Sequence, residues 1–242
     1  MTSAVKPIGR KAYGSIGHLP GSRMGPADHH VHPGQAAICT AKLRDRRDLV
    51  IVQEKLDGSC VAVVRLGDEL HAIGRAGWPA QSSRHEMHQL FAAWVRERSD
   101  RFLGVLRDGE RIVGEWLAQA HGTIYDLSEH EPFAAFDIMA GERRIPYSEF
   151  HARVPGHFAT PTLLHHGGAL SVADAMRRHR AEGGHWPCDE VEGVVYRVER
   201  DGEVEFLAKY VRHDKIDGKY LDGPQIWNWR PSGSAVGLDG EG

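Results

Sequence analysis

The heptapeptide QEKLDGS, residues 53–59, decides how the rest of the chain is interpreted. Its Asp-Gly pair is typical of a tight turn and apolar residues flank it, so the pattern predicts strands over residues 49–52 and 60–66. Lys55 lies where the first strand ends. A lysine amine has a pKa of about 10.4 and is a poor nucleophile unless it is desolvated beside other cations. The heptapeptide alone therefore leaves two interpretations open: a surface hairpin, or a strand end that presents a reactive lysine.

Composition limits the class of protein. Of the 242 residues, 41% are hydrophobic and 26% are charged, which predicts one folded domain with at most a small appendage. No apolar run approaches the roughly 18 residues of a membrane-spanning helix, and the first residues lack a signal-peptide pattern. The three cysteines are far apart, which is typical of free thiols in a reducing cytoplasm. We therefore expect a cytoplasmic protein without a membrane partner. Because the net charge is -3, a polyanion would need a local basic patch.

Hydrophobic periodicity predicts an α+β domain with mainly antiparallel strands. Helical spacing predicts one helix over residues 84–98 and another that begins after Ser171. Further strands are expected at residues 69–74, 111–118, 132–139, 192–199 and 203–211. Residues 1–48 show neither period, so we expect an irregular N-terminal segment packed on the domain. Residues 49–222 would form the domain and residues 223–242 a short C-terminal tail.

Five further segments associated with strands carry polar residues that a plain core does not need. They are GRAG at 74–77, GEW at 114–116, FAAFD at 133–137, EGVV at 192–195 and LAKYVR at 207–212. Each alone has an ordinary explanation, such as an edge-strand charge for Glu115 or a core aromatic for Phe136. Together with EKLDG, and in this order, they resemble the motifs of the covalent nucleotidyltransferase superfamily, which comprises ATP-dependent RNA and DNA ligases and mRNA-capping enzymes. The resemblance is closest to the RNA ligases and spans about residues 49–212.

The resemblance implies both a fold and a reaction. The fold is a mainly antiparallel β nucleotidyltransferase domain (an ATP-grasp-like ligase adenylation domain) with packed helices. No C-terminal OB-fold is expected, because about thirty residues follow Arg212. The reaction is that of an ATP-dependent RNA ligase, which joins 5′-phosphate and 3′-hydroxyl ends through a lysyl-AMP intermediate and an adenylylated 5′ end. RNA is the implied partner, and ATP with Mg²⁺ or Mn²⁺ are the implied cofactors. A minimal ligase for DNA or hybrid nicks, and a nucleotide-binding module without catalysis, stay open as alternatives.

Three matching residues are implied to carry the chemistry. Lys55 would attack the α-phosphorus of ATP, and Glu192 would bind the divalent metal ion or its water. Lys209 would neutralise charge on the α-phosphate, and its field, with that of the metal ion, would depress the pKa of Lys55.

The last motif departs from the family pattern, which usually has two lysines one residue apart. The residues at that spacing from Lys209 are Leu207 and Val211. The second cation is therefore left to one of three nearby residues: Arg212, Lys215 or Lys219.

The remaining matching residues are implied to bind the nucleotide: Gln53, Glu54, Asp57, Gly58, Arg75, Glu115, Phe136 and Val194, together with Lys209. Glu54 would lie near the adenine edge. Asp57 and Gly58 would form the turn that presents the amine, where a side chain in place of Gly58 would crowd the nucleotide.

Four of these residues would contact the base, the sugar and a phosphate. Phe136 would stack on one face of the adenine and Val194 would close the other face. Glu115 would accept hydrogen bonds from the ribose hydroxyls. Arg75 would contact the nucleotide or the 5′-phosphate of the nucleic acid, because a planar guanidinium suits phosphate oxygens.

The N-terminal segment contains a compact histidine group, made of His29, His30 and His32 after Asp28. Such a group can bind a metal ion, but no matching ligand stands elsewhere at zinc-like spacing, so loop histidines are favoured. Basic and hydroxyl residues of the same segment support a second hypothesis, a flap that contacts phosphate; they are Arg10, Lys11, Ser22 and Arg23.

Overall fold

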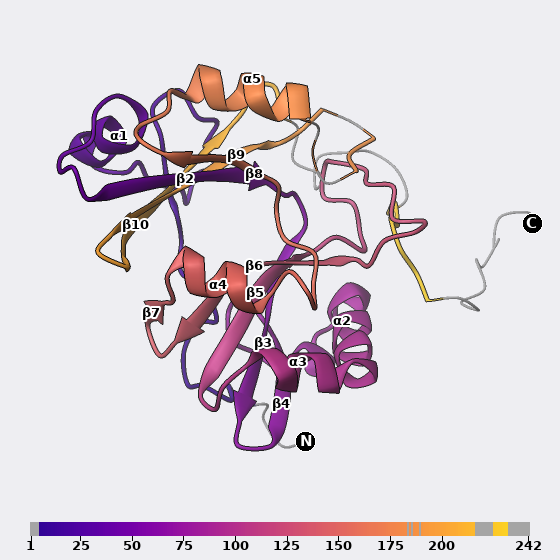
Figure 1. The fold of residues 1–242 in the computed structure, drawn as a ribbon. Coiled ribbons are helices and arrows are strands. Elements are labelled where there is room, and N and C mark those ends of the chain that lie inside the picture. The colour runs from indigo at the N-terminus through magenta and orange to yellow at the C-terminus, as the bar shows by residue number, and fades with distance from the viewer. Residues whose placement is uncertain (1–4, 183, 185, 189, 216–224, 232–242) are drawn as a thin grey trace, which may run out of the picture.

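The computed structural model describes residues 5–182, 184, 186–188, 190–215 and 225–231. Within these residues, ten strands form two five-stranded sheets, and five α-helices pack against them (Figure 1). The architecture is the predicted α+β class with mainly antiparallel strands. No helix of the described chain is both long and apolar enough to cross a membrane.

The first sheet has the strand order β1-β10-β9-β2-β8, and all neighbouring pairs are antiparallel except β1 and β10. Its strands are β1 (Gly17–His18), β2 (Asp48–Lys55), β8 (Leu163–Gly167), β9 (Gly193–Arg200) and β10 (Glu203–Val211). Helices α1 (Pro33–Thr40) and α5 (Val172–Glu182) lie on one side of this sheet (Figure 1). Alternate residues of β2 and β9, such as Val52 and Val194, pack with these helices in one apolar core.

The second sheet has the order β4-β3-β5-β6-β7 and is antiparallel throughout. Its strands are β3 (Ser59–Leu66), β4 (Glu69–Gly74), β5 (Glu110–Trp116), β6 (Phe133–Ala140) and β7 (Arg143–Arg144). The short 3-10 helix η1 (Ala80–Ser82) leads into α2 (Glu86–Glu97), which is followed by α3 (Ser99–Val105), and α4 (Tyr147–Arg153) follows β7. Helix α2 is the helix predicted over residues 84–98. Its Phe91 and Trp94 rings lie 5.2 and 5.6 Å from the Trp116 ring, so aromatic contacts attach α2 to β5.

The QEKLDGS heptapeptide connects the two sheets. Lys55 ends β2 in the first sheet and Ser59 begins β3 in the second, and these strands do not pair with each other. The interpretation as a hairpin is therefore wrong. A Cβ atom on Gly58 would lie 2.6 Å from the carbonyl oxygen of Trp116, so only glycine fits between the turn and β5. The protein backbone therefore already requires glycine here, and the crowding of a nucleotide stays a prediction.

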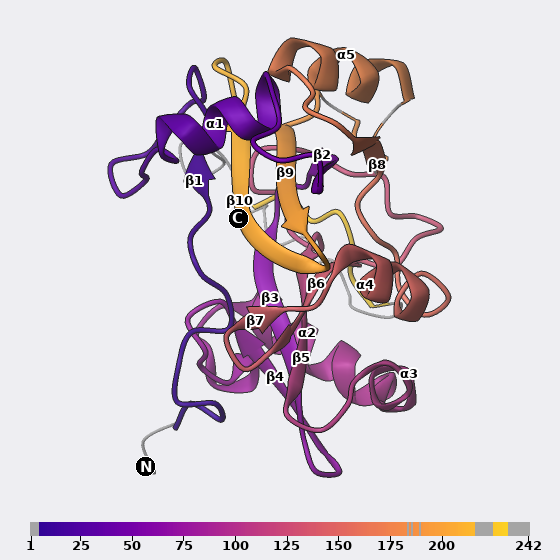
Figure 2. The same ribbon diagram turned by 60° about the vertical axis from the view of Figure 1, so that its left-hand side comes forward.

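The N-terminal segment is more regular than predicted, because it contains β1 and α1. Figure 2 shows it running from the second sheet up to the first. The His32 side chain accepts a hydrogen bond from the Gly34 N–H, and Gln35 accepts one from the His32 N–H, so both residues cap α1. Pro33 occupies the first helical position, where proline is favoured. An eight-residue helix shows too little periodicity to be recognised in the sequence.

Two histidines of the N-terminal group lie against the protein's own backbone. His32 is a helix cap, and Nδ1 of His30 lies 3.3 Å from the His18 carbonyl oxygen. No group of three or more His, Cys, Asp or Glu side chains in the described ranges is arranged to hold a metal ion. His32 therefore caps a helix that the sequence did not indicate, and the interpretation of the other two as loop histidines stays a prediction.

Residues 225–231, which were expected to belong to a short tail, pack against the second sheet. The Asn228 side chain donates to the Leu117 carbonyl and accepts from the Tyr125 N–H. The Trp229 ring lies edge-on to Trp116 with 5.8 Å between ring centroids. These contacts attach the segment to the end of β5.

Candidate active site

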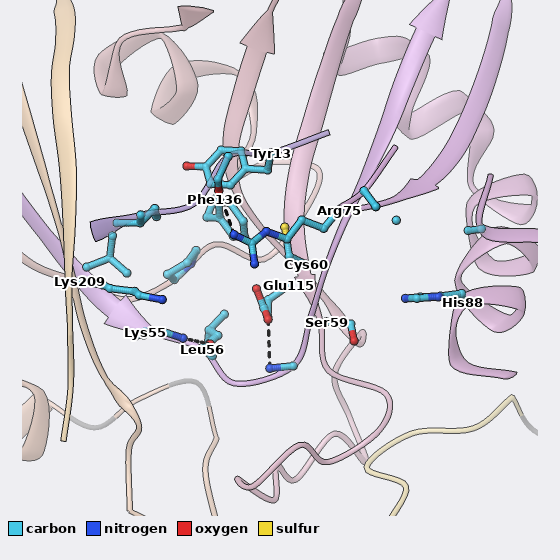
Figure 3. Close-up of a pocket in the computed structure, with 18 of the residues that line it drawn as sticks. Tyr13, Lys55, Leu56, Ser59, Cys60, Arg75, His88, Glu115, Phe136 and Lys209 are labelled. Atoms are coloured by element: carbon cyan, nitrogen blue, oxygen red, sulfur yellow. Dashed lines mark hydrogen bonds between the residues drawn. The ribbon is translucent and has the colours of Figure 1, made fainter. Parts of the chain in front are cut away.

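A cavity of about 920 Å³ lies between the two sheets (Figure 3). Its wall is formed by β2, β9 and β10 of the first sheet, by β3, β5 and β6 of the second, by the β4–η1 loop and by the N-terminal segment. The structure brings eight of the predicted residues to this wall: Gln53, Glu54, Lys55, Gly58, Arg75, Glu115, Phe136 and Lys209. Three other predicted residues lie outside the wall: Asp57, Glu192 and Val194.

Strand pairing brings Lys55 and Glu192 together. Lys55 ends β2 and lies opposite Gly193, the first residue of the antiparallel strand β9. Glu192 directly precedes β9, and its Oε2 lies 2.6 Å from Lys55 Nζ in a largely buried ion pair. The pair therefore depends on the register between β2 and β9 and not on closeness in the sequence.

Carboxylates dominate the electrostatics around Lys55. Burial by itself lowers the pKa of Lys55, but the negative charges of Glu192, Glu115 and Asp57 outweigh burial and raise this pKa above the ordinary lysine value. The prediction that neighbouring cations depress the pKa of Lys55 is wrong for the protein's own side chains. The effect runs the other way, because burial and then the charge of Lys55 lower the pKa of Lys209.

Glu115 extends from β5 into the cavity (Figure 3). Its Oε1 accepts a hydrogen bond from the Gly58 N–H at 3.1 Å, which links the turn to the second sheet. Burial raises the pKa of Glu115 to about 8; Lys55 opposes this rise, and Glu192 and Asp57 add to it. The raised pKa favours the protonated Glu115 carboxyl, which can donate as well as accept hydrogen bonds.

Asp57 turns away from the cavity wall toward a second lysine. Its Oδ2 lies 2.8 Å from Nζ of Lys215, a residue that is only 4% exposed. Of the other candidates for the second cation, Arg212 pairs with two exposed acidic residues, and Lys219 lies outside the described residues. The geometry therefore favours Lys215, which reaches the heptapeptide from beyond β10.

Strand alternation corrects one predicted contact. Val194 is fully buried in the apolar core beneath α1 and α5, whereas Val195 lines the cavity. Successive side chains of a strand point to opposite faces, so only one of these valines can face the cavity. Val195 therefore lines the cavity in place of Val194, together with Phe136. The Phe136 ring is itself held edge-on by Tyr13, with 5.3 Å between centroids, and Tyr13 is a wall residue that the sequence did not indicate.

Gln53 and Glu54 are bound by the chain segment that leads into β8. The Gln53 amide donates to the Pro161 carbonyl at 3.3 Å. Oε1 of Glu54 accepts from the N–H and the hydroxyl of Thr162 at 2.7 and 2.9 Å. Both residues also line the cavity, so a base edge bound here would add to these hydrogen bonds.

The N-terminal segment positions Lys209. Strand β1 pairs with β10 so that His18 lies beside Lys209. Asp28 joins the two, because its Oδ1 lies 3.6 Å from Lys209 Nζ and its Oδ2 lies 3.2 Å from His18 Nε2. His18 is buried, and its other ring nitrogen lies 2.7 Å from Ser22 Oγ. Sequence reasoning noted Asp28 only beside the histidine group, since its link to Lys209 depends on pairing across most of the chain.

The predicted phosphate-contacting flap differs from the segment observed at the cavity. The residues expected to form it lie off the cavity wall: Arg10, Lys11, Ser22 and Arg23. Other residues of the N-terminal segment line the wall instead: Tyr13, Gly14 and Ile16. One guanidinium nitrogen of Arg75 donates to the Gly14 carbonyl at 3.2 Å and to the Ser15 hydroxyl at 3.3 Å. At this part of the wall the segment therefore orients Arg75.

A family model described as RNA ligase matches residues 48–211. Among solved structures, an archaeal ATP-dependent RNA ligase is 21% identical, with a TM-score of 0.49 and a match that covers 83% of this chain and 48% of that one. Two mutants of a Naegleria gruberi RNA ligase, both solved with AMP and Mn, are 16% identical with TM-scores of 0.51. Those matches cover 86% and 81% of this chain and 62% and 59% of theirs. No curated protein matches the chain.

The two N. gruberi structures share the fold of this chain, so the predicted α+β ligase fold is confirmed. The chain spans about half to three fifths of the length of these solved ligases. The residues matched by the family model run from the start of β2 to the end of β10 and include both Lys55 and Lys209.

Proposed function

The chain belongs to the RNA ligase family, and on that premise we propose that it is an ATP-dependent RNA ligase that joins 5′-phosphate and 3′-hydroxyl ends through a lysyl-AMP intermediate. The observation that supports this most is Lys55, which enters the cavity from the end of β2 and pairs with Glu192 at 2.6 Å. Glu115 and Lys209 face the same cavity from two other strands (Figure 3). A lysine nucleophile, carboxylates and a second cation around one cavity are the groups that covalent nucleotidyl transfer requires.

In the first step, the Lys55 amine attacks the α-phosphorus of ATP. A bond forms between Nζ and phosphorus, the bond from phosphorus to the bridging oxygen breaks, and pyrophosphate leaves. Because the pKa of Lys55 is raised, the amine must first lose a proton. Oε2 of Glu192 already accepts a hydrogen bond from this amine, so it is the nearest described acceptor for that proton.

Two lysines near Lys55 would have different roles. Lys209 lines the cavity and is held there by Asp28, so we assign it to the α-phosphate. Lys215 lies behind the turn and holds Asp57, so we assign it to the orientation of the turn that presents Lys55.

The apolar part of the wall suits a nucleoside. Phe136 and Val195 offer two faces for a base, and such stacking contributes ~1–3 kcal/mol per base. Glu115, with its partly protonated carboxyl, can accept from or donate to the ribose hydroxyls. Gln53 lines the wall on the same strand as Lys55, where its amide would meet the edge of the base.

The side chains around Lys55 fit one divalent cation. Burial raises the pKa of Glu192, so a nearby positive charge would favour its ionised form. Mg²⁺ usually takes one or two protein carboxylates and completes its shell with water and phosphate oxygens. Glu192 would hold the ion, and the ion would shield the phosphate charges.

The later steps transfer AMP from Lys55 to the RNA. The bond between Nζ and phosphorus breaks as an oxygen of the 5′-phosphate attacks the AMP phosphorus. The 3′-hydroxyl of the other end then attacks the activated 5′-phosphate, and AMP leaves. Arg75 is exposed on the cavity wall, and its planar guanidinium suits the oxygens of the incoming 5′-phosphate.

Covalent labelling tests the first step. Purified protein is incubated with α-labelled ATP and Mg²⁺ and separated on a denaturing gel. We expect a labelled band for the wild type and none for Lys55→Ala. Lys42 is an exposed lysine outside the cavity, so the control variant Lys42→Ala should keep the label. Label in Lys55→Ala would overturn the assignment of the nucleophile.

Two further results would redirect the proposal. Labelling by GTP alone would indicate a capping-type reaction, and no labelling of folded, AMP-free protein would indicate a nucleotide-binding module. The acceptor is then tested with single-stranded RNA ends, nicked RNA and nicked DNA. Sealing of DNA or hybrid nicks alone would replace the RNA ligase proposal with a minimal nick ligase.

A further inference from the structure

The cavity extends past the residues that the proposed reaction uses. Beyond Arg75 its wall continues through the β4–η1 loop to the start of α2, and we call this part the outer lobe; its principal side chains are those of Trp78, Ser83, Arg84, His85 and His88. Figure 3 shows His88 on the opposite side of the cavity from Lys55. The total volume of about 920 Å³ lies near the top of the range of roughly 300–1,000 Å³ that holds one compact ligand. The nucleotide contacts proposed above use none of the outer-lobe side chains, so the outer lobe is a candidate site for a second group.

Trp78 is the most informative residue of the outer lobe. It lines the cavity and is 49% exposed, and it is the one aromatic side chain among the large exposed hydrophobic residues of the described chain. Nζ of Lys6 lies 4.8 Å from the centroid of its ring. An exposed indole beside a cation is a surface on which a nucleobase can stack while its phosphate meets positive charge.

The loop that carries Trp78 is held firmly in place. The Gly74 N–H donates to the Trp78 carbonyl at 2.9 Å, and the Ala12 N–H donates to the Arg75 carbonyl at the same distance. Gly77 has φ +88°, and a Cβ atom there would lie 1.9 Å from the Arg10 carbonyl oxygen. Trp78 is therefore presented by a fixed backbone and not by a loose loop, which lowers the entropy lost on binding.

The outer lobe is positively charged, unlike the chain as a whole. Arg75 and Arg84 line it, Lys6 lies over Trp78, and the chain's net charge is -3. The two carboxylates on the described wall, Glu54 and Glu115, belong to the part near Lys55. Glu86 follows the lobe in sequence, but it forms an ion pair with Arg230 at 3.0 Å. The lobe thus combines an aromatic surface with two arginines that form no ion pair with the described part of the chain, on the same cavity as Lys55.

We propose that the outer lobe binds the end of a single-stranded nucleic acid, with a nucleobase stacked on Trp78 and backbone phosphate beside Arg84. This inference rests on the proposed function, because it places the strand that receives AMP next to Lys55. A single strand is required, since the base that lies on Trp78 must be free of its own stacking and pairing. Stacking on an indole does not distinguish the four bases, so the lobe selects a free strand end and not a sequence.

Binding of a fluorescently labelled, 5′-phosphorylated RNA dodecamer, followed by anisotropy at fixed salt and without ATP, tests the proposal. We expect Trp78→Ala to weaken binding about 10-fold, the equivalent of losing ~1.4 kcal/mol of stacking, and Trp78→Phe to recover most of it. Leu66→Ala removes another exposed apolar side chain far from the cavity and should bind like the wild type. A loss of affinity in Leu66→Ala as large as in Trp78→Ala would overturn the role of Trp78.

The charge of the lobe is tested by salt dependence. Arg84→Gln should lower the slope of log affinity against log salt by about 0.7, the value for one phosphate contact on a single strand. Arg46 is also an exposed arginine but lies outside the cavity, so Arg46→Gln is the matched control and should leave the slope unchanged. Equal slopes in Arg84→Gln and Arg46→Gln, or equal affinity of the wild type for a blunt duplex, would overturn the proposal.

Adenylylation, measured without RNA on each protein, separates this inference from the proposed function. If the wild type is labelled by ATP but binds no oligonucleotide, the outer lobe is not a strand-binding site, and the proposed adenylylation step still stands. If the wild type binds the oligonucleotide through Trp78 but takes no label from ATP, the proposed ligase function is wrong and the outer lobe remains a strand-binding site. If Trp78→Ala loses label in proportion to affinity, Trp78 acts on the nucleotide site and the inference is wrong.

Discussion

Two buried charge clusters border the same cavity and differ in how well their charges are matched. The lysine cluster consists of Lys55, Glu192, Glu115, Asp57 and Lys215. The arginine cluster consists of Arg197, Asp137, Glu199, Arg144 and Tyr13. Both take residues from each of the two sheets, so the clusters link the sheets at neighbouring places. Only the arginine cluster satisfies its carboxylates completely.

The arginine cluster gives each carboxylate several donors. Asp137 accepts from the Tyr13 hydroxyl at 2.9 Å and pairs with Arg144 at 3.0 Å and with Arg197 at 3.2 Å. Glu199 pairs with Arg197 and accepts from the Tyr147 N–H at 2.8 Å. Buried charges matched in this way keep the sheets in register and leave nothing for a ligand to neutralise.

The lysine cluster, in contrast, has a surplus of negative charge. Burial raises the pKa of both Glu115 and Glu192, although Lys55 opposes the rise in each case. A cation or a hydrogen-bond partner from outside would relieve this surplus. The difference between the clusters teaches that buried ionic groups serve the fold where they are matched, and are available for binding and chemistry where they are not.

The largest effect is expected when the proposed nucleophile of the lysine cluster is replaced by a residue of the same charge. Lys55→Arg retains a cation beside Glu192, but a guanidinium has no accessible neutral form with which to attack phosphorus. We expect adenylylation to fall by at least about 10³-fold, with a nearly unchanged unfolding midpoint in urea. Retained labelling in this variant would show that Lys55 serves only as a charge.

The next largest effect is expected when an arginine is removed from the arginine cluster. Arg197→Met leaves Asp137 and Glu199 without their shared partner, and breaking a buried ionic pair costs about 3–5 kcal/mol. Urea denaturation measures this loss as a lower midpoint, and Arg46→Met, at an exposed position, is the control. A change below about 1 kcal/mol, the usual value of a surface pair, would mean that the cluster is not structural.

The pH dependence of stability tests whether the lysine cluster raises the pKa of Glu115. Its pKa rises from an ordinary 4.5 to about 8 in the folded protein, so folding favours the protonated carboxyl. The contribution of Glu115 to stability is therefore complete below pH 4.5 and is lost as the pH rises toward 8. Glu115→Gln mimics the protonated form, so the variant should gain stability relative to the wild type across that window.

The measurement is the urea midpoint of both proteins at about pH 5 and about pH 8. We expect a smaller change than in Arg197→Met, because the substitution leaves no charge unpaired. If the two proteins keep the same difference at both pH values, the Glu115 carboxyl does not titrate in this window.

The smallest effects are expected for alanine substitutions at two neighbouring valines. Val194→Ala removes methyl groups from the core beneath α1 and α5 and should cost about 2 kcal/mol of stability, measured by urea denaturation. Val195→Ala alters the cavity wall and should instead weaken ATP binding, measured by the ATP dependence of adenylylation. If Val194→Ala weakened ATP binding and Val195→Ala did not, Val194 and not Val195 would face the cavity.

The sequence predicted local chemistry better than it predicted the arrangement of segments. Helix α2 was recognisable because its apolar residues recur at helical spacing. The cavity residues from Lys55 to Lys209 were recognisable because each motif has a characteristic local composition. Helix α1 and strand β8 were not predicted, because both are short and rich in histidine, glycine or proline. The supposed hairpin at Asp57-Gly58 failed because a turn signal does not say which strands pair.

The sequence by itself determined the family and the order of the motifs, because covalent chemistry demands particular residue types in short stretches. Only the tertiary structure decided that Val195 and not Val194 faces the cavity, that Lys215 holds Asp57, and that Asp28 holds Lys209. Those facts depend on strand register and on contacts between distant segments. Local spacing carries no information about either, because pairing is selected by the packing of the whole chain.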